Sequence, residues 1–200
     1  MATTRLETFC DGVIAIAATL LILDVRATGA HLGSQLTHIW PSYAAYAISF
    51  LTIGIIWVNH HTVMSVIGSV DRRFLFINVL FLMTVAFAPF PTRLVAEYVR
   101  AGGSDARDAA LAYGFTFTAM SITYVSMWLY AVGGGRLLRA EADPKLVAGI
   151  SRSFRPGTLM YLGATLVAFA SPAASVALFA AIALFYVVES SVFAPARGRP

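Results

Sequence analysis

A run of residues near the start of the chain, RLETFCDGVIAIAATLLILD from Arg5 to Asp24, combines membrane-compatible apolar residues with groups that can bind or pair with ions. Arg5 and Asp11 carry opposite charges, and Thr19 offers a hydroxyl oxygen. A charge at the centre of a membrane costs at least about 2.5–3.5 kcal/mol, so we expect Asp11 to be paired or hydrated rather than to face lipid. The chemistry open to this segment is therefore ion passage or buried hydrogen bonding.

Partners for Asp11 occur in the next apolar run. The stretch SFLTIGIIWVNHH ends in polar and aromatic residues, and a lone Asn78 lies early in the run after that; the polar set is Trp57, Asn59, His60, His61 and Asn78. If the runs are successive membrane helices, this set lies at the depth of Arg5 and Asp11. Two interpretations stand: a structural hydrogen-bond network between helices, or a proton relay from Asp11 to His60 or His61, since buried carboxylates and imidazoles titrate near neutral pH.

Further along the first run, Ile16, Thr19 and Leu23 are spaced i, i+3, i+7. At about 100° per residue these three side chains lie within about 60° of one another, which makes a single stripe of apolar, hydroxyl and apolar groups down one helix face. Such a stripe is typical of a packing seam between helices, where threonine often bonds its own preceding carbonyl, but it also suits the wall of a pore. Geometry alone leaves both open.

The composition places these residues in a membrane protein. Of 200 residues, 58% are hydrophobic and 12% are charged, whereas soluble domains have about 45–50% apolar and about 25% charged residues. The apolar residues gather into runs of membrane-spanning length, and we predict an all-α, polytopic membrane protein with six transmembrane helices at residues 8–25, 39–67, 74–90, 109–132, 159–170 and 172–192. Ser171 and Pro172 predict a tight turn between the last two, although one long kinked helix is also compatible.

The basic residues sort by membrane side. With a cytoplasmic N-terminus, ten of them fall inside and four outside, the outside ones being Arg26, Arg93, Arg100 and Arg107. This imbalance predicts that both termini are cytoplasmic, and it explains the net charge of +4 without a nucleic-acid partner. Glu7 and Asp11 stand with Arg5 before the uninterrupted apolar stretch, so the segment lacks the clearly positive start of a signal peptide, which favours a retained span over a cleaved one.

The chain is expected to be a single transmembrane domain over residues 1–200. Its longest connection is a basic segment at about 133–156, which we predict to be a cytoplasmic linker with one or two amphipathic turns, and the Pro-Phe-Pro of residues 89–91 is expected to end the third helix.

Enzymatic and transporter chemistries have weaker support. His60 and His61 are adjacent and point about 100° apart, so they do not form the i, i+4 pair that a metal site needs, and the single cysteine, Cys10, makes no multi-thiolate site. No serine–histidine or paired-carboxylate constellation is recognisable, so we expect no enzyme activity and no cofactor. A proton-coupled transporter using Asp11 with His60 or His61 is the alternative, but the paired helix interruptions typical of transporters are not visible.

The motif RLETFCDG, with Arg5, Phe9 and Asp11, resembles the RxxxFSD signature of the potassium-channel family of transmembrane protein 175. DGVIAIAATLLILD, SFLTIGIIWVNHH and INVLFLMTVAFAPFPTRLVAEY are similar to the first three helices of that family, so the resemblance is rich in motifs through about residue 97. The later half matches in hydropathy only. Cys10 stands where the family usually has serine, which weakens one hydrogen bond and should leave the pattern intact. A single set of six helices suggests the bacterial type.

This resemblance implies a homotetramer in a bacterial plasma membrane, with membrane lipid around it and the first helix of each subunit lining a central potassium pathway. It places the hydrophobic constriction at Ile16 and a layer of threonines at Thr19, with Leu23 one turn further on. The chain has no TVGYG-type segment, so dehydration at a narrow apolar ring is the mechanism that remains, with modest selectivity for potassium over sodium. The resemblance implies no bound metal ion other than potassium passing through the pore.

Overall fold

The computed structural model describes residues 3–26 and 31–192, and the regular structure in these ranges is helical. The elements in chain order are α1 (Thr3–Leu20), the 3₁₀ turn η1 (Leu21–Asp24), α2 (Leu32–His38), α3 (Trp40–Val66), α4 (Arg72–Phe87), α5 (Pro89–Tyr98), α6 (Gly103–Val132), the 3₁₀ turn η2 (Gly133–Gly135), α7 (Pro144–Val167) and α8 (Pro172–Val192). The expected all-α class is confirmed.

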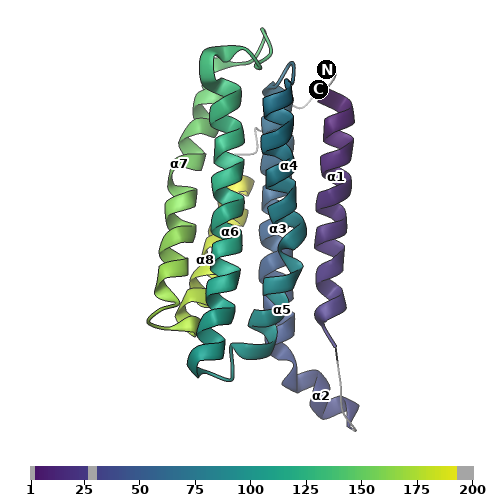
Figure 1. Ribbon diagram of the computed structural model, residues 1–200, viewed down its shortest axis with the longest axis vertical. Coiled ribbons are helices and arrows are strands. Elements are labelled where there is room, and N and C mark those ends of the chain that lie inside the picture. Colours follow the sequence, from purple (N-terminus) through teal and green to yellow (C-terminus); the bar gives the residue numbers. More distant parts are fainter. Residues whose placement is uncertain (1–2, 27–30, 193–200) are drawn as a thin grey trace.

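The long helices run up and down side by side in one bundle (Figure 1). α6 lies in the middle and packs against α4, α5, α7 and α8, whereas α1 lies at the edge and packs mainly against α3 and α4. Four segments in the described ranges are long and apolar enough to cross a membrane: Thr3–Asp24, Trp40–Val66, Arg72–Tyr98 and Gly103–Gly135. α7 and α8 complete the bundle as an antiparallel pair, and their crossing of the membrane stays a prediction.

The third apolar run does not end at its Pro-Phe-Pro, as we expected from the sequence. The chain bends at Ala88, and α5 continues from Pro89 to Tyr98. Proline has no N–H to donate and a fixed φ, so it breaks the hydrogen-bond ladder of α4 but is well suited to the first turn of a new helix. The Thr92 hydroxyl donates to the Ala88 carbonyl at 2.8 Å and helps to satisfy the backbone at the break.

The expected linker at about 133–156 is also shorter than predicted, because α7 begins at Pro144 rather than near residue 159. Asp143 caps this helix, its carboxylate accepting from the Lys145 amide at 2.8 Å, and Pro144 occupies the first turn. Pro156 lies inside the helix without ending it. At the other end of α7, Ser171 accepts from the Ala174 amide at 3.3 Å, so the predicted turn between two separate helices is confirmed.

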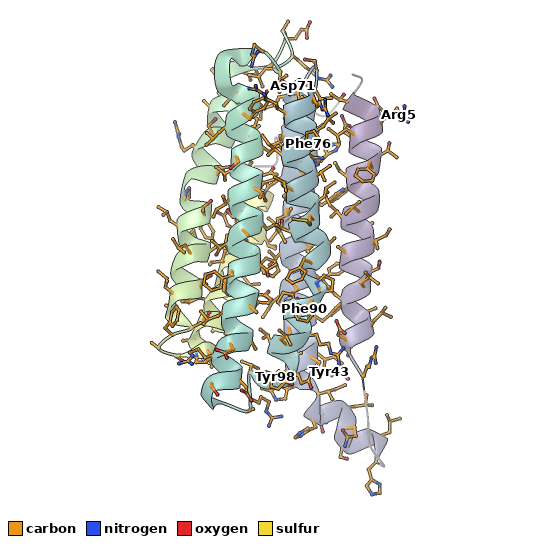
Figure 2. The ribbon with its side chains drawn as sticks, viewed as in Figure 1. Arg5, Tyr43, Asp71, Phe76, Phe90 and Tyr98 are labelled. Carbon is orange, nitrogen blue, oxygen red and sulfur yellow. The ribbon has the colours of Figure 1, made fainter. Side chains whose placement is uncertain are left out.

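The connection between α3 and α4 is tied to the connection between α6 and α7. Asp71 caps α4 by accepting from the Phe74 amide at 2.8 Å, and its other oxygen accepts from the Tyr130 hydroxyl at 2.6 Å. These two donors hold the pKa of Asp71 below its usual value. A carboxyl with a lowered pKa stabilises the fold at neutral pH, and that contribution is lost as the pH falls through the folded-state pKa. Figure 2 shows Asp71 at the same end of the bundle as Arg5.

Helices α6 and α7 approach each other closely at Gly114. A Cβ added there would lie 2.5 Å from the Thr165 hydroxyl oxygen, and Thr165 is fully buried and bonded to Thr118 at 3.0 Å. The absence of a side chain at Gly114 therefore sets the distance between these two helices, as small residues commonly do in membrane bundles.

We predict that Gly114→Ala lowers the free energy of unfolding by about 1–3 kcal/mol, the usual range for an overpacked core. Gly163→Ala on α7 is the matched control, because a Cβ there meets nothing within 4 Å and alanine favours the helix. The measurement is denaturant unfolding in detergent. Equal stability of the two variants would contradict the close approach.

Candidate functional site: the polar network and the exposed face of helix α1

Two neighbouring residues of α1 hold it to two different helices. The Trp57 indole N–H on α3 donates to Asp11 Oδ1 at 2.9 Å. The Asn78 side-chain amide on α4 donates to Cys10 Sγ at 3.0 Å. Because Cys10 and Asp11 point in different directions around α1, their hydrogen bonds fix both the position of this helix and its rotation about its own axis.

The second of these contacts continues into the bundle through His60. Its Nε2 lies 3.3 Å from Asn78 Oδ1, so the Asn78 amide joins α1 and α3 through its two ends. Asn78 is fully buried and His60 is 2% exposed, with its ring stacked on Phe81 at 5.8 Å. In an apolar environment, leaving one of these groups unpaired costs more than the bond itself contributes.

The structure leaves four of the predicted network residues out of this cluster. Among the described residues the ion pairs are Arg93–Glu97 and Arg107–Asp108, so Arg5 and Asp11 do not pair with each other. Phe9 is exposed, outside the face of α1 that packs into the bundle. His61 is also exposed, and its ring lies 6.5 Å from that of Trp57. Asn59 points away from α1, toward a cavity between α3, α6, α7 and α8.

The predicted stripe on α1 lies on the side of the helix that faces away from the bundle. Ile16 is 60% exposed and Leu23 57%, and Thr19 is also exposed. The opposite face is buried against α3 and α4 and consists of Cys10, Ile14, Ala17 and Leu21. The Thr19 hydroxyl donates to the Ile16 carbonyl at 2.9 Å, so its oxygen keeps lone pairs directed outward.

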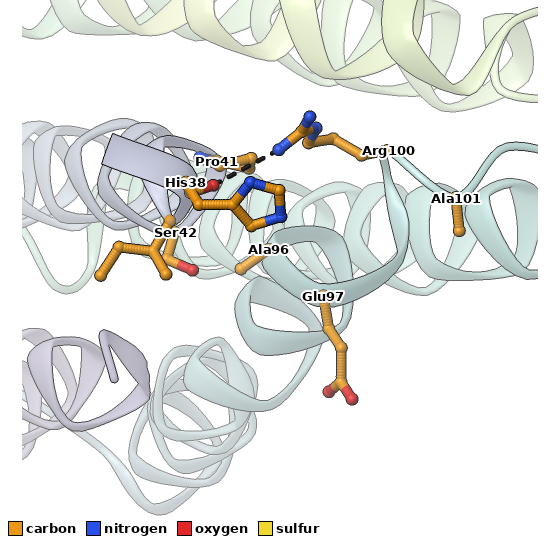
Figure 3. Close-up of a pocket in the computed structure, with 8 residues that line it drawn as sticks. His38, Pro41, Ser42, Ala96, Glu97, Arg100 and Ala101 are labelled. Carbon is orange, nitrogen blue, oxygen red and sulfur yellow. Dashed lines mark hydrogen bonds between the residues drawn. The ribbon is translucent and has the colours of Figure 1, made fainter. Parts of the chain in front are cut away.

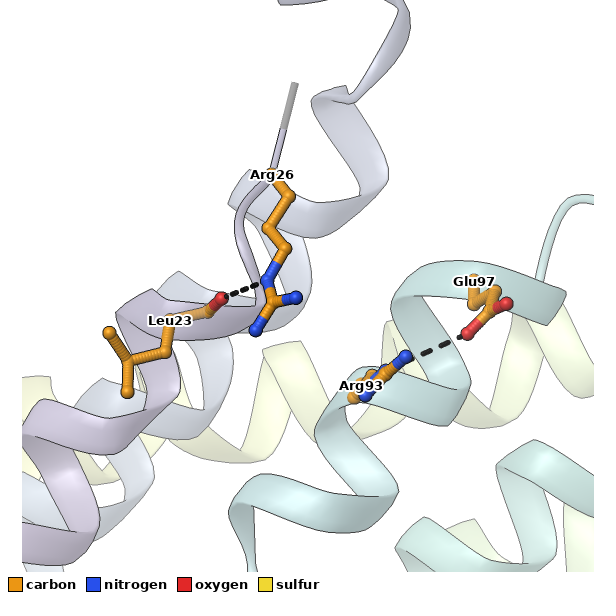
Figure 4. A network of polar contacts seen from close by, with 4 residues as sticks. All are labelled: Leu23, Arg26, Arg93 and Glu97. Atoms are coloured by element: carbon orange, nitrogen blue, oxygen red, sulfur yellow. Dashed lines mark hydrogen bonds and ion pairs between the residues drawn. The ribbon is translucent and has the colours of Figure 1, made fainter. Parts of the chain in front are cut away.

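A second polar region lies at the opposite end of the bundle, beyond Leu23. The Arg26 Nε donates to the Leu23 carbonyl at 2.8 Å, which caps the end of the first span, and Arg93 pairs with Glu97 at 3.8 Å on α5 (Figure 4). Next to it, Arg100 donates to the His38 carbonyl at 3.3 Å across a pocket of about 370 Å³ (Figure 3). These contacts lie on the surface and are worth little to stability.

Sequence reasoning missed a hydroxyl cluster between α3, α5 and α6. The Ser49 hydroxyl lies 2.9 Å from Thr92 Oγ1 and 3.0 Å from Tyr113 Oη, which ties α3 to α5 and α6. The three residues are buried and lie on three different helices, and no motif in the sequence connects them. The described residues contain no group of three or more histidine, cysteine or acidic side chains that could hold a metal ion.

We predict that His60→Leu lowers the free energy of unfolding by about 1–3 kcal/mol, because it leaves the Asn78 carbonyl oxygen buried without its partner. His61→Leu, the same change at the next position, removes no hydrogen bond in the described network and should leave stability within about 0.5 kcal/mol. Unfolding of both variants in the same detergent checks this. If His61 instead relayed protons, His61→Leu would reduce transport more than His60→Leu, and neither change would alter the stability.

Comparison with known proteins gives consistent matches. A family model described as "Endosomal/lysosomal potassium channel TMEM175" matches residues 5–89. A potassium channel of Streptomyces collinus is 40% identical over 186 residues, covering 91% of this chain and 90% of that protein. A potassium channel of Chamaesiphon minutus is 38% identical over 195 residues, covering 94% and 95%. The crystal structure of a lysosomal potassium-selective channel TMEM175 homolog from Chamaesiphon minutus superposes with a TM-score of 0.85 at 36% identity, covering 94% of this chain and 97% of that one.

Proposed function

Because this chain belongs to the family of the potassium channel TMEM175, we propose that it is an integral membrane protein that conducts potassium passively through a pore lined by α1. In this proposal four copies assemble around an axis, six helices of each copy cross the membrane, and both termini lie in the bacterial cytoplasm. The basic residues that favour this orientation include Arg197 and Arg199, which lie outside the described residues.

The observation that carries the proposal is the division of α1 into two faces. One face packs against α3 and α4, while the other exposes Phe9, Ile16 and Leu23 beyond half of their surface. In a membrane such a face meets lipid or other subunits. The presence of the Thr19 hydroxyl within the apolar stripe favours a subunit axis, where an oxygen has a permeating ion to bind.

The proposed mechanism of selectivity is dehydration at a ring of Ile16 side chains. Methyl groups hold water poorly, so an ion entering the ring loses part of its hydration shell, and potassium loses its shell more readily than sodium. The Thr19 hydroxyls follow within one turn, and their outward lone pairs partly replace the lost water. Potassium is the permeant ion, no cofactor takes part, and selectivity over sodium is modest.

The network behind the stripe has a supporting role in this proposal. Trp57, Asn78 and His60 fix the rotation of α1, and they thereby determine which of its side chains face the axis. A proton-coupled carrier would require Asp11 to exchange protons with a histidine, yet Asp11 accepts from Trp57 and His60 is bound to Asn78.

We predict that Ile16→Asn raises potassium leak sharply, because an amide hydrogen-bonds water and keeps the constriction wet. The measurement is ion flux in proteoliposomes containing folded protein. Ala17→Asn is the matched control: Ala17 is 1% exposed and packs into the bundle, so an amide there should reduce yield and stability without raising the flux of whatever protein folds. Equal flux in Ile16→Asn and wild type would remove α1 from the pore.

A separate prediction concerns Thr19. Thr19→Val keeps the branched shape but removes the hydroxyl oxygen, so the preference for potassium over sodium should fall while protein yield is unchanged, because the Ile16 carbonyl retains its backbone partner in the helix. Reversal potentials with potassium on one side and sodium on the other measure the preference. An unchanged preference would make Thr19 a packing residue.

A further inference from the structure

Helix α7 is held against α6 by side-chain hydroxyls that repeat every seven residues. Their hydrogen bonds join Ser151 to Trp128 at 3.0 Å, Thr158 to Ser121 at 2.8 Å and Thr165 to Thr118 at 3.0 Å. Because seven residues make almost two complete turns of an α-helix, the three hydroxyls of α7 lie on one face. These bonds to α6 therefore fix the rotation of α7 about its own axis.

A second stripe of α7, one residue further along at each repeat, faces away from the bundle. The members of this outer stripe, again seven residues apart, are Lys145, Arg152, Leu159 and Leu166. All four side chains are exposed, and Leu159 is 70% exposed. The outer stripe changes from basic to apolar between Arg152 and Leu159, over about 10 Å of helix.

The charged residues of α7 all have the same sign. Its sequence contains Lys145, Arg152 and Arg155 but no aspartate or glutamate. Neither Lys145 nor Arg152 has an ion pair with a residue that the structure describes. Asp143, just before the helix, accepts from the Lys145 amide as the N-cap. A cation in the first turn opposes the helix dipole, so the side chain of Lys145 is not explained by the stability of α7.

The position of α7 in the bundle indicates what the outer stripe meets. α7 packs against α6 and α8, and it lies at the edge of the bundle opposite to α1 (Figure 1). In the proposed assembly around α1, this edge is the periphery and faces lipid. A stripe that is apolar in one half and basic in the other fits a helix passing through the membrane surface, where lysine and arginine reach headgroup phosphates.

We propose that the outer stripe of α7 binds an anionic phospholipid. Lys145 and Arg152 bind the phosphate and the headgroup, while the acyl chains lie along Leu159 and Leu166. An anionic headgroup is favoured over a zwitterionic one because α7 has no carboxylate to pair with a headgroup amine. This inference rests on the proposed assembly and on the crossing of the membrane by α7, but it does not require that the protein conduct potassium.

Melting temperatures in nanodiscs of two compositions test the site. Wild-type protein should melt about 2–4 °C higher in phosphatidylglycerol than in phosphatidylcholine, because a lipid that binds the folded state stabilises it. Combining Lys145→Gln with Arg152→Gln should abolish this difference and leave the melting temperature in phosphatidylcholine unchanged, since both side chains are exposed. A variant that keeps the full difference would overturn the proposal.

Two controls separate this site from a general effect of charge. Combining Arg93→Gln with Arg107→Gln removes two cations that already have ion pairs at the opposite end of the bundle, and it should preserve the difference between the two lipids. Loss of the difference in this control would show a non-specific effect and reject the site. Inorganic phosphate added to the phosphatidylcholine nanodiscs should not raise the melting temperature, and an equal rise would identify a soluble anion instead of a lipid.

A nitroxide spin label tests the depth of α7 separately. In a Cys10→Ser background, a label at Leu159→Cys should collide with dissolved oxygen and be protected from a water-soluble nickel chelate, whereas a label at Ala148→Cys should show the reverse. Access of nickel to the first label would reject both the crossing and the lipid site, while Ile16→Asn would still test the potassium pathway. A label at Leu159→Cys that neither reagent reaches would indicate a second copy of the chain and would also overturn the lipid site.

Discussion

The attachment of α1 through polar side chains is the constraint on which the rest of the arrangement depends. A helix in a membrane gains little from burying apolar surface, since lipid is as apolar as another helix. Hydrogen bonds from Trp57 to Asp11 and from Asn78 to Cys10 therefore supply a directional contact that packing does not. By fixing the rotation of α1, they also decide that Ile16 and Thr19 lie on its outer face.

The remaining helices pack together behind that contact. α6 packs against α4, α5, α7 and α8, and the Gly114–Thr165 approach brings α7 close to it. Hydroxyl pairs such as Ser49 with Thr92 and Thr118 with Thr165 connect helices that lie far apart in the sequence. Each apolar run thus carries a few buried polar groups, and these groups give the helix pairs their specific register.

The sequence was sufficient to predict the class, the family, and most helix positions, because apolar runs bounded by charges are a strong signal. The resemblance to the transmembrane protein 175 family is confirmed by relatives that cover nearly the whole chain. Helix boundaries near proline were harder to predict. A proline is compatible with either the end or the beginning of a helix. In the structure, Pro89 and Pro91 lie in the first turn of α5 and Pro144 in the first turn of α7. The linker prediction was too long for that reason.

Side-chain directions within the polar cluster were only partly predictable. Three consecutive residues, Asn59, His60 and His61, face three different surroundings, because successive positions of a helix are about 100° apart. Which of them meets α4 depends on the rotation of α3, and that rotation is set by contacts with helices remote in the sequence. The partner of Asp71 was equally hidden, since Tyr130 lies 59 positions away.

The central claim is that ions cross this protein passively along α1. Simultaneous recording of potassium and proton movement in proteoliposomes tests it most directly. For passive conduction we expect potassium to move down its own gradient without saturating at rising concentration, at a rate that does not depend on an imposed pH gradient. Potassium flux that saturates and stops when the pH gradient is removed would contradict the account and identify a proton-coupled carrier.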